Sequence, residues 1–100
     1  MEEQGHMAAA DYLRWEAVGD KVSRQGRIED EDLDWAISTM QKPSTNPSEL
    51  HSTIISLFLA PRTLTPSQKQ KIHDAVLPLL SSKDEDDRML SRMAIRKVSK

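Results

Sequence analysis

The chain has 100 residues, enough for one small domain with a single core. Hydrophobic residues make up 37% and charged residues 30%, as in an ordinary soluble domain, and no apolar run approaches the roughly 18 residues of a membrane span. There is no cysteine, which excludes disulfides, thiolate metal sites and thiol catalysis. Together with the lack of a signal-peptide pattern, this predicts an intracellular, cytoplasmic protein.

The net charge of −2 conceals an asymmetry between the two halves of the chain. Residues 1–50 hold five Lys or Arg and eleven Asp or Glu, whereas residues 51–100 hold nine and five. Halves of opposite charge attract either within one molecule or between copies. A homodimer is therefore one arrangement that the sequence suggests.

Residues 1–7 are polar and lack periodicity, so we expect a disordered start or a cloning remnant before a single helical domain over 8–100. Gly5-His6-Met7 has the form of a cloning scar, in which case the natural chain begins at Met7. A native disordered start is the alternative.

A helix pair is predicted over 8–42. The first helix, about 8–25, carries one apolar stripe, and Gly26 suits the left-handed residue that ends a helix. Gly19 inside it indicates a close helix crossing. The stripe consists of Tyr12, Trp15, Val18 and Val22, widened by Leu13 and Ala17.

The second helix, about 30–41, has an apolar face formed by Leu33, Ala36, Ile37 and Met40. Its first turn is acidic, which the helix dipole favours, and no EF-hand pattern supports Ca²⁺ binding instead. Ile28 and Leu33 are spaced to form a hydrophobic staple. Trp15 and Trp35 are either core residues or exposed anchors for a partner.

Residues 43–47 form either a flexible link or a loop between helix pairs. Two capping boxes, each with proline in the first helical position, then start helices over 47–60 and 66–81. They are Asn46 with Glu49 and Thr65 with Gln68. The helix over 47–60 is the most hydrophobic, so we expect it at the centre. Pro78 should kink or bend the next helix near its end.

A last helix is predicted over 84–98, capped by Ser82 or Asp84. Its inward stripe is expected to consist of Leu90, Met93, Ala94 and Val98. Together with Ile72, Ala75, Val76, Leu79 and Leu80, this stripe predicts a helical hairpin that packs on a neighbouring layer.

This hairpin carries a family resemblance. The matching residues are Leu77-Pro78, Leu79-Leu80, Asp84, Arg88, Ala94-Ile95 and Val98. In this pattern, residues 72–98 resemble a HEAT repeat, although Asp87 stands where that family usually has an aliphatic residue. The resemblance covers about a quarter of the chain. It implies a protein-interaction surface without catalytic machinery, capped by the N-terminal helices or by a second molecule.

Pairs such as His51-Ser52 and His73-Asp74 contain the residue types of hydrolytic sites, but adjacent residues on a helix point about a hundred degrees apart. The sequence has no HExxH motif and no glycine-rich phosphate loop. We therefore expect no enzymatic activity, no cofactor and no metal site.

The last helix carries a basic ridge, Arg88, Arg92 and Arg96, with Lys97 and Lys100 beside its end. The ridge is a solvated face, a surface for an acidic protein partner, or a surface for nucleic-acid phosphates. The sequence therefore predicts an all-α domain of about five helices in antiparallel pairs. Its expected function is that of a scaffold or protein-interaction module, with a helical nucleic-acid-associated regulator as the alternative.

Overall fold

The computed structural model describes residues 7–100, and this part of the chain is all α-helical, as predicted. It contains five α-helices and one short 3-10 helix, with no strand. The elements are α1 Ala9–Gln25, α2 Asp30–Met40, α3 Pro47–Leu59, α4 Pro66–Val76, η1 Leu77–Ser81 and α5 Glu85–Val98. None of the helices described has the length and apolarity that crossing a bilayer requires.

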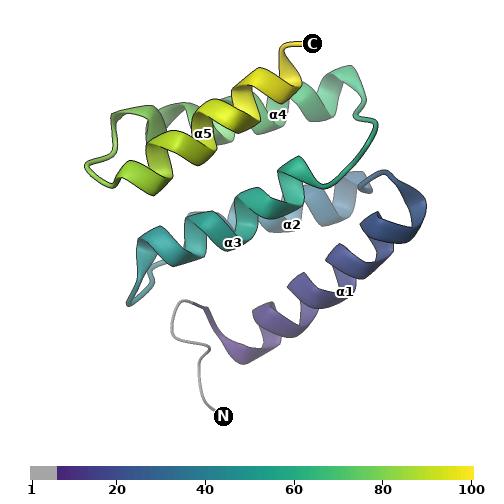
Figure 1. The fold of residues 1–100 in the computed structure, drawn as a ribbon. Helices are drawn as coiled ribbons and strands as arrows, with labels where there is room; N and C mark the ends of the chain where they lie inside the picture. Colours follow the sequence, from purple (N-terminus) through teal and green to yellow (C-terminus); the bar gives the residue numbers. More distant parts are fainter. Residues whose placement is uncertain (1–6) are drawn as a thin grey trace.

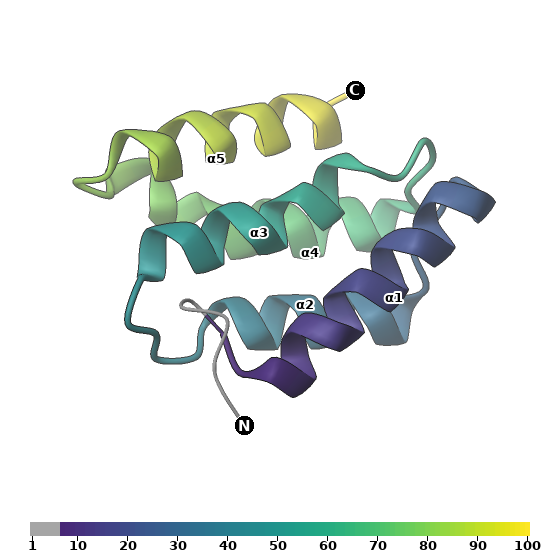
Figure 2. The ribbon, with the colours of Figure 1, turned by 60° about the horizontal axis from the view of Figure 1, so that its bottom comes forward.

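The helices form two layers (Figure 1). α1, α3 and α5 make the front layer, and α2 and α4 lie behind them. The hairpins α2–α3 and α4–α5 are therefore antiparallel pairs that lie side by side, and α1 flanks α3 on the side away from α5. Figure 2 shows that α1 is inclined to α3.

Helices of the same layer run in the same direction at a nearly constant separation in sequence. In the front layer, His51 contacts Asp87 and Lys97 donates to the Pro61 carbonyl, each pair 36 residues apart. Three further contacts within a layer, 37 or 38 residues apart, join Trp15 to Thr53, Asp30 to Gln68 and Asp34 to Lys71. The fold thus repeats a helical unit of about 37 residues that no sequence repeat marks.

The centre of the core is α3, as its composition predicted. Its buried side chains are Leu50, Ile54, Ile55, Leu57 and Phe58. Residues from every other α-helix join them, among them Val22, Leu33, Ile72 and Ala94. Met7, assigned from the sequence to the disordered start, is buried against this core at 6% exposure, while residues 1–6 of that predicted segment lie outside the described residues.

Several residues predicted to face inward are exposed. Met93 is 43% exposed and Leu13 is 62% exposed. The buried face of α5 consists instead of Asp87, Ser91, Ala94 and Val98, with Leu90 at its edge. The observed face is therefore rotated about the helix axis relative to the predicted stripe. The prediction missed this rotation because it counted only apolar residues, and two of the buried positions are polar.

Two of the predicted helix-end signals are confirmed in full, and a third is confirmed in part. Gly26 is left-handed, with φ 74°, and Thr65 forms a complete capping box with Gln68. Asn46 accepts a hydrogen bond from the Glu49 backbone N–H, but its own backbone N–H donates to the Ser44 hydroxyl. The Glu49 carboxylate accepts from the Asn46 side-chain amide at 3.2 Å, so the second contact of the predicted box is made by a side chain.

The helix predicted over 66–81 changes its type just before Pro78. The α-helical pattern of α4 ends at Val76, and η1 continues as a 3-10 helix over Leu77–Ser81. Asp84, and not Ser82, caps α5 by accepting from the backbone N–H of Asp87 at 3.1 Å. Gly19 does not mark a close crossing, since a Cβ added there would lie 3.8 Å from Leu57, an ordinary contact.

Candidate anion-binding surface

Much of the charge on α1 and α2 is neutralised by ion pairs. Lys21 Nζ lies 2.8 Å from Asp32 and 3.2 Å from Glu29, and these hydrogen bonds, chiefly the one to Asp32, raise the pKa of Lys21. Lys71 Nζ lies 2.8 Å from Asp34, which raises the pKa of Lys71 in the same way. These ammonium groups are committed to internal carboxylates, so the available positive charge lies elsewhere.

The structure divides the predicted basic ridge. Arg88 is half-buried, and its guanidinium donates to the Ser82 carbonyl at 2.7 Å. Lys97 is also half-buried and donates to the Pro61 carbonyl at 2.6 Å. Arg92 and Arg96 are exposed, with neither an ion pair nor a hydrogen bond to any described residue. Within the predicted ridge, only Arg92 and Arg96 therefore present free guanidinium groups to solvent.

Two methionines share the exposed side of α5 with these arginines. Met89 is 45% and Met93 is 43% exposed, and their four-residue spacing matches that of Arg92 and Arg96. Residues spaced in this way lie on one side of a helix. We call these four residues the Met–Arg face.

A second basic feature lies beside the end of α5. It is a cleft of about 400 Å³ between this helix end, α4 and the loop that follows α3. Its lining residues are Arg62, Thr63, Leu64, Lys69, Lys97 and Lys100. Four of the six carry a positive charge and none is acidic, so we call it the basic cleft.

Backbone hydrogen bonds fix one wall of the basic cleft. The carbonyl of Gly26 accepts from the backbone N–H groups of Arg62 and Thr63, at 2.8 and 3.2 Å. The Arg62 guanidinium lies against Gly26 so closely that a Cβ there would come within 2.5 Å of it. The left-handed glycine after α1 therefore holds the loop and leaves the space that this guanidinium occupies.

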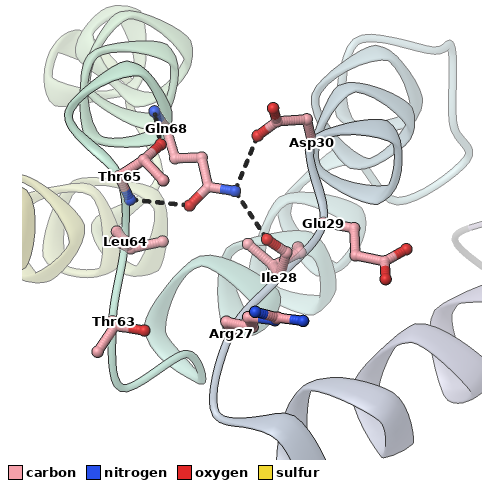
Figure 3. Close-up of a pocket in the computed structure, with 8 residues that line it drawn as sticks. All are labelled: Arg27, Ile28, Glu29, Asp30, Thr63, Leu64, Thr65 and Gln68. Carbon is pink, nitrogen blue, oxygen red and sulfur yellow. Dashed lines mark hydrogen bonds between the residues drawn. The ribbon is translucent and has the colours of Figure 1, made fainter.

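The other side of the same loop borders a hollow of about 480 Å³, shown in Figure 3. Gln68 spans it, donating to the Ile28 carbonyl at 2.7 Å and to Asp30 at 2.9 Å. Its side-chain oxygen accepts from the backbone N–H of Thr65 at 3.0 Å. The Gln68 side-chain amide is thus bonded on both its oxygen and its nitrogen, and this hollow functions as a structural junction between α2 and α4.

The tryptophans lie apart from the ridge, on α1 and α2. Trp15 is half-buried and donates to the Thr53 carbonyl at 2.9 Å. Trp35 is half-buried as well, and the Arg14 guanidinium lies 5.0 Å from its ring centroid, within the range of a cation–π contact. Both rings pack against the core.

A polar cluster couples α3 to the start of α5. His51 Nδ1 lies 3.2 Å from both carboxylate oxygens of Asp87, and the Ser82 hydroxyl donates to the same carboxylate at 2.9 Å. The hydroxyl therefore contacts the acid and not the imidazole, unlike the nucleophile–base contact of serine hydrolases. Asp87 is buried, so these bonds explain how a carboxylate is accommodated inside the fold.

No protein-family model, curated protein or solved structure gives a significant match to the chain. The class is therefore defined by the structure itself, as a two-layer all-α domain of side-by-side hairpins with a basic end. Sequence patterns alone missed Arg62 and Lys69 as partners of Lys97, because these residues meet only through the tertiary fold. The predicted helix starts at residues 47 and 84 are 37 positions apart. This regular spacing could have indicated that the ends of these two helices, and so Arg62 and Lys97, lie close together.

Proposed function

We propose that the protein is a small non-enzymatic interaction module that binds an acidic surface of another protein through the Met–Arg face. The observation that carries this proposal is the pairing of two free guanidinium groups with two exposed methionines on one helix face. Arginine and methionine are enriched in protein interfaces. The methionine side chains adapt to the partner's shape, and the arginines accept carboxylates in bidentate geometry.

The architecture supports the same proposal. Side-by-side hairpins with a regular spacing are the arrangement of helical repeat proteins, which use the surfaces of stacked helices to bind partners. The resemblance of residues 72–98 to a HEAT repeat, noted from the sequence, implies the same kind of function. In the proposal, α1 caps the side of α3 opposite α5, and the Met–Arg face is left for the partner.

Charge reversal tests the proposal. Proteins cross-linked to the wild type in cells are identified by mass spectrometry, and the affinity of each purified candidate is measured by calorimetry. We expect Arg92→Glu with Arg96→Glu to weaken binding roughly tenfold or more, since each guanidinium would otherwise form a charge-assisted hydrogen bond. The matched control is Arg27→Glu with Lys83→Glu, two exposed cations elsewhere, and it should change the affinity by less than about threefold. Equal losses in both variants would contradict the proposal.

A salt titration separates this function from nucleic-acid binding. Phosphate contacts with a duplex weaken steeply as salt increases, because they release counterions. We expect no binding to a generic DNA duplex at low salt, measured by fluorescence anisotropy. Salt-dependent duplex binding that is lost in Arg92→Glu with Arg96→Glu would instead support the alternative function, a nucleic-acid-associated regulator.

A further inference from the structure

The basic cleft contains cations that the fold places near one another in advance. Lys97 Nζ donates to the Pro61 carbonyl at 2.6 Å, and Lys69 Nζ donates to the Lys100 carbonyl at 3.0 Å. Both lysines are half-buried, so these bonds hold two ammonium groups at the cleft. An ammonium group has three N–H donors, so each retains donors for a ligand. Much of the side-chain entropy that binding would cost is therefore already lost on folding.

The remaining two cations have no counterion. Arg62 and Lys100 are exposed, and neither side chain forms an ion pair or hydrogen bond with a residue in the described range 7–100. The Arg62 guanidinium lies against Gly26. The main-chain oxygen of Lys100 offsets part of the charge of Lys69, but the like charges around this concavity still repel one another. An anion placed among them would weaken this repulsion.

We propose that the basic cleft is a binding site for a compact multivalent anion of the phosphate class. Phosphate offers several strong acceptor oxygens to the fixed ammonium groups, and a guanidinium binds it in bidentate geometry. A cleft of about 400 Å³ is within the range of small-ligand sites. The cations surround one hollow, which suits a small phosphate compound better than the extended backbone of a nucleic acid. This site is separate from the Met–Arg face.

Pyrophosphate and inorganic phosphate are the probes, titrated at constant ionic strength into the full chain. Calorimetry should show one saturable site, with pyrophosphate bound more tightly because it carries more charge. Amide resonances of Arg62 to Leu64 and around Lys97 should shift in nuclear magnetic resonance spectra, and those of α1 should not. Sodium acetate, the carboxylate control, should bind at least roughly tenfold more weakly, because it carries a single charge.

Two variants with the same change in net charge locate the site. Arg62→Gln with Lys97→Gln should weaken pyrophosphate binding roughly tenfold or more, whereas Arg92→Gln with Arg96→Gln should change it by less than about threefold. Circular dichroism checks folding, and Arg62→Gln alone, at an exposed position, should still weaken binding by roughly fivefold. The latter variant keeps the test valid if loss of the Lys97 bond to Pro61 unfolds the chain.

Three results would overturn the site. They are the absence of saturable pyrophosphate binding, equal losses in the two double variants, and a DNA duplex that binds more tightly than pyrophosphate with equal sensitivity to both variants. The last two outcomes indicate a diffuse positive field and no site. Failure here leaves the proposed protein interaction intact, because that interaction depends on Arg92 and Arg96 and is measured with a different ligand.

Discussion

At Gly26, the backbone conformation favours a residue without a Cβ, and the Arg62 guanidinium occupies the space that a Cβ would take. Its φ of 74° is in the left-handed region, and an added Cβ would come within 2.5 to 2.9 Å of three Arg62 atoms. Its carbonyl also holds the backbone N–H groups of the loop that forms the basic cleft. One residue thus ends α1 and positions the Arg62 side chain.

Gly26→Ala should therefore lower the free energy of unfolding by about 1–2 kcal/mol from the backbone conformation alone. It should also displace Arg62, which is visible as changed amide shifts at Arg62 and Thr63. Urea unfolding measures the first effect and nuclear magnetic resonance the second. An unchanged unfolding midpoint would contradict this account.

Gly19→Ala is the matched control, and its expected effect on the free energy of unfolding is of the opposite sign. Gly19 is inside α1, where a Cβ would make an ordinary 3.8 Å contact with Leu57. Because alanine is the better helix former, this variant should stabilise the protein by about 0.5–1 kcal/mol. Destabilisation would show that α1 packs on α3 more tightly than the structure indicates.

Single residues also show where sequence patterns fail. The pattern on α5 predicted an inward Met93, but Ser91 takes an inward position at 0% exposure. Asp87 is inward because His51 and Ser82 satisfy its carboxylate, and both partners come from outside α5. Periodicity counts apolar residues, so a buried polar residue with tertiary partners shifts the predicted face.

At the scale of the helices, local chemistry determined most boundaries. The capping box joins Thr65 to Gln68, and the left-handed Gly26 donates to the Val22 carbonyl. In each of these signals the partners are at most four positions apart in the chain. Such features are legible in sequence because their partners are neighbours in the chain. The contacts at Asn46 follow the same logic, since Ser44 and Glu49 are two and three positions from it in the chain.

Gln68 links this local chemistry to the tertiary structure. Its side chain is buried and bonds Thr65, the Ile28 carbonyl and Asp30. Gln68→Ala should lower the free energy of unfolding by about 2–3 kcal/mol, since it leaves buried backbone groups without a partner. Gln70→Ala, on the exposed side of the same helix, should change it by less than about 0.5 kcal/mol. Chemical denaturation of both variants makes the comparison, and similar losses would contradict it.

The cap of α5 predicts a dependence on pH. The Asp84 carboxylate accepts from the Asp87 backbone N–H and bonds the Ser48 side chain, which lowers the pKa of Asp84 below its ordinary value of 3.8. A group whose pKa is lowered by folding contributes its stability fully above the unfolded value and loses it as the pH falls through the folded one.

Asp84→Asn should therefore show a shallower loss of stability than the wild type below pH 3.8, because its amide still caps α5 but does not titrate. Urea unfolding at a series of pH values from neutral to acidic measures both curves. Parallel curves below that pH would mean that Asp84 is not responsible.

On the scale of the molecule, α3 is covered by α1, α2 and α5, whereas α1 has only three buried residues. Local opening should follow this difference in burial. We expect amide hydrogens of α3 to exchange most slowly and those of α1 most rapidly, measured residue by residue in deuterated solvent. Protection of α1 equal to that of α3 would contradict this order.

The all-α class, the central helix and the hairpins could be predicted from the sequence. Each follows from the apolar faces of individual helices, which the spacing of apolar residues reveals. The basic cleft was not. Arg62 and Lys97 are 35 positions apart and meet because two parallel helices place the end of α3 beside the end of α5. Nothing near either residue in the chain indicates that meeting.

The loop after α3 has two sides. Thr63 and Leu64 line the basic cleft and also the hollow that Gln68 spans. A movement of this loop would therefore enlarge one of the two hollows and narrow the other. Displacing this loop toward α2 or away from it would strain the hydrogen bonds that the Gln68 side chain makes to Thr65 and Ile28. A ligand in the basic cleft is therefore expected to alter the stability of the junction between the two hairpins.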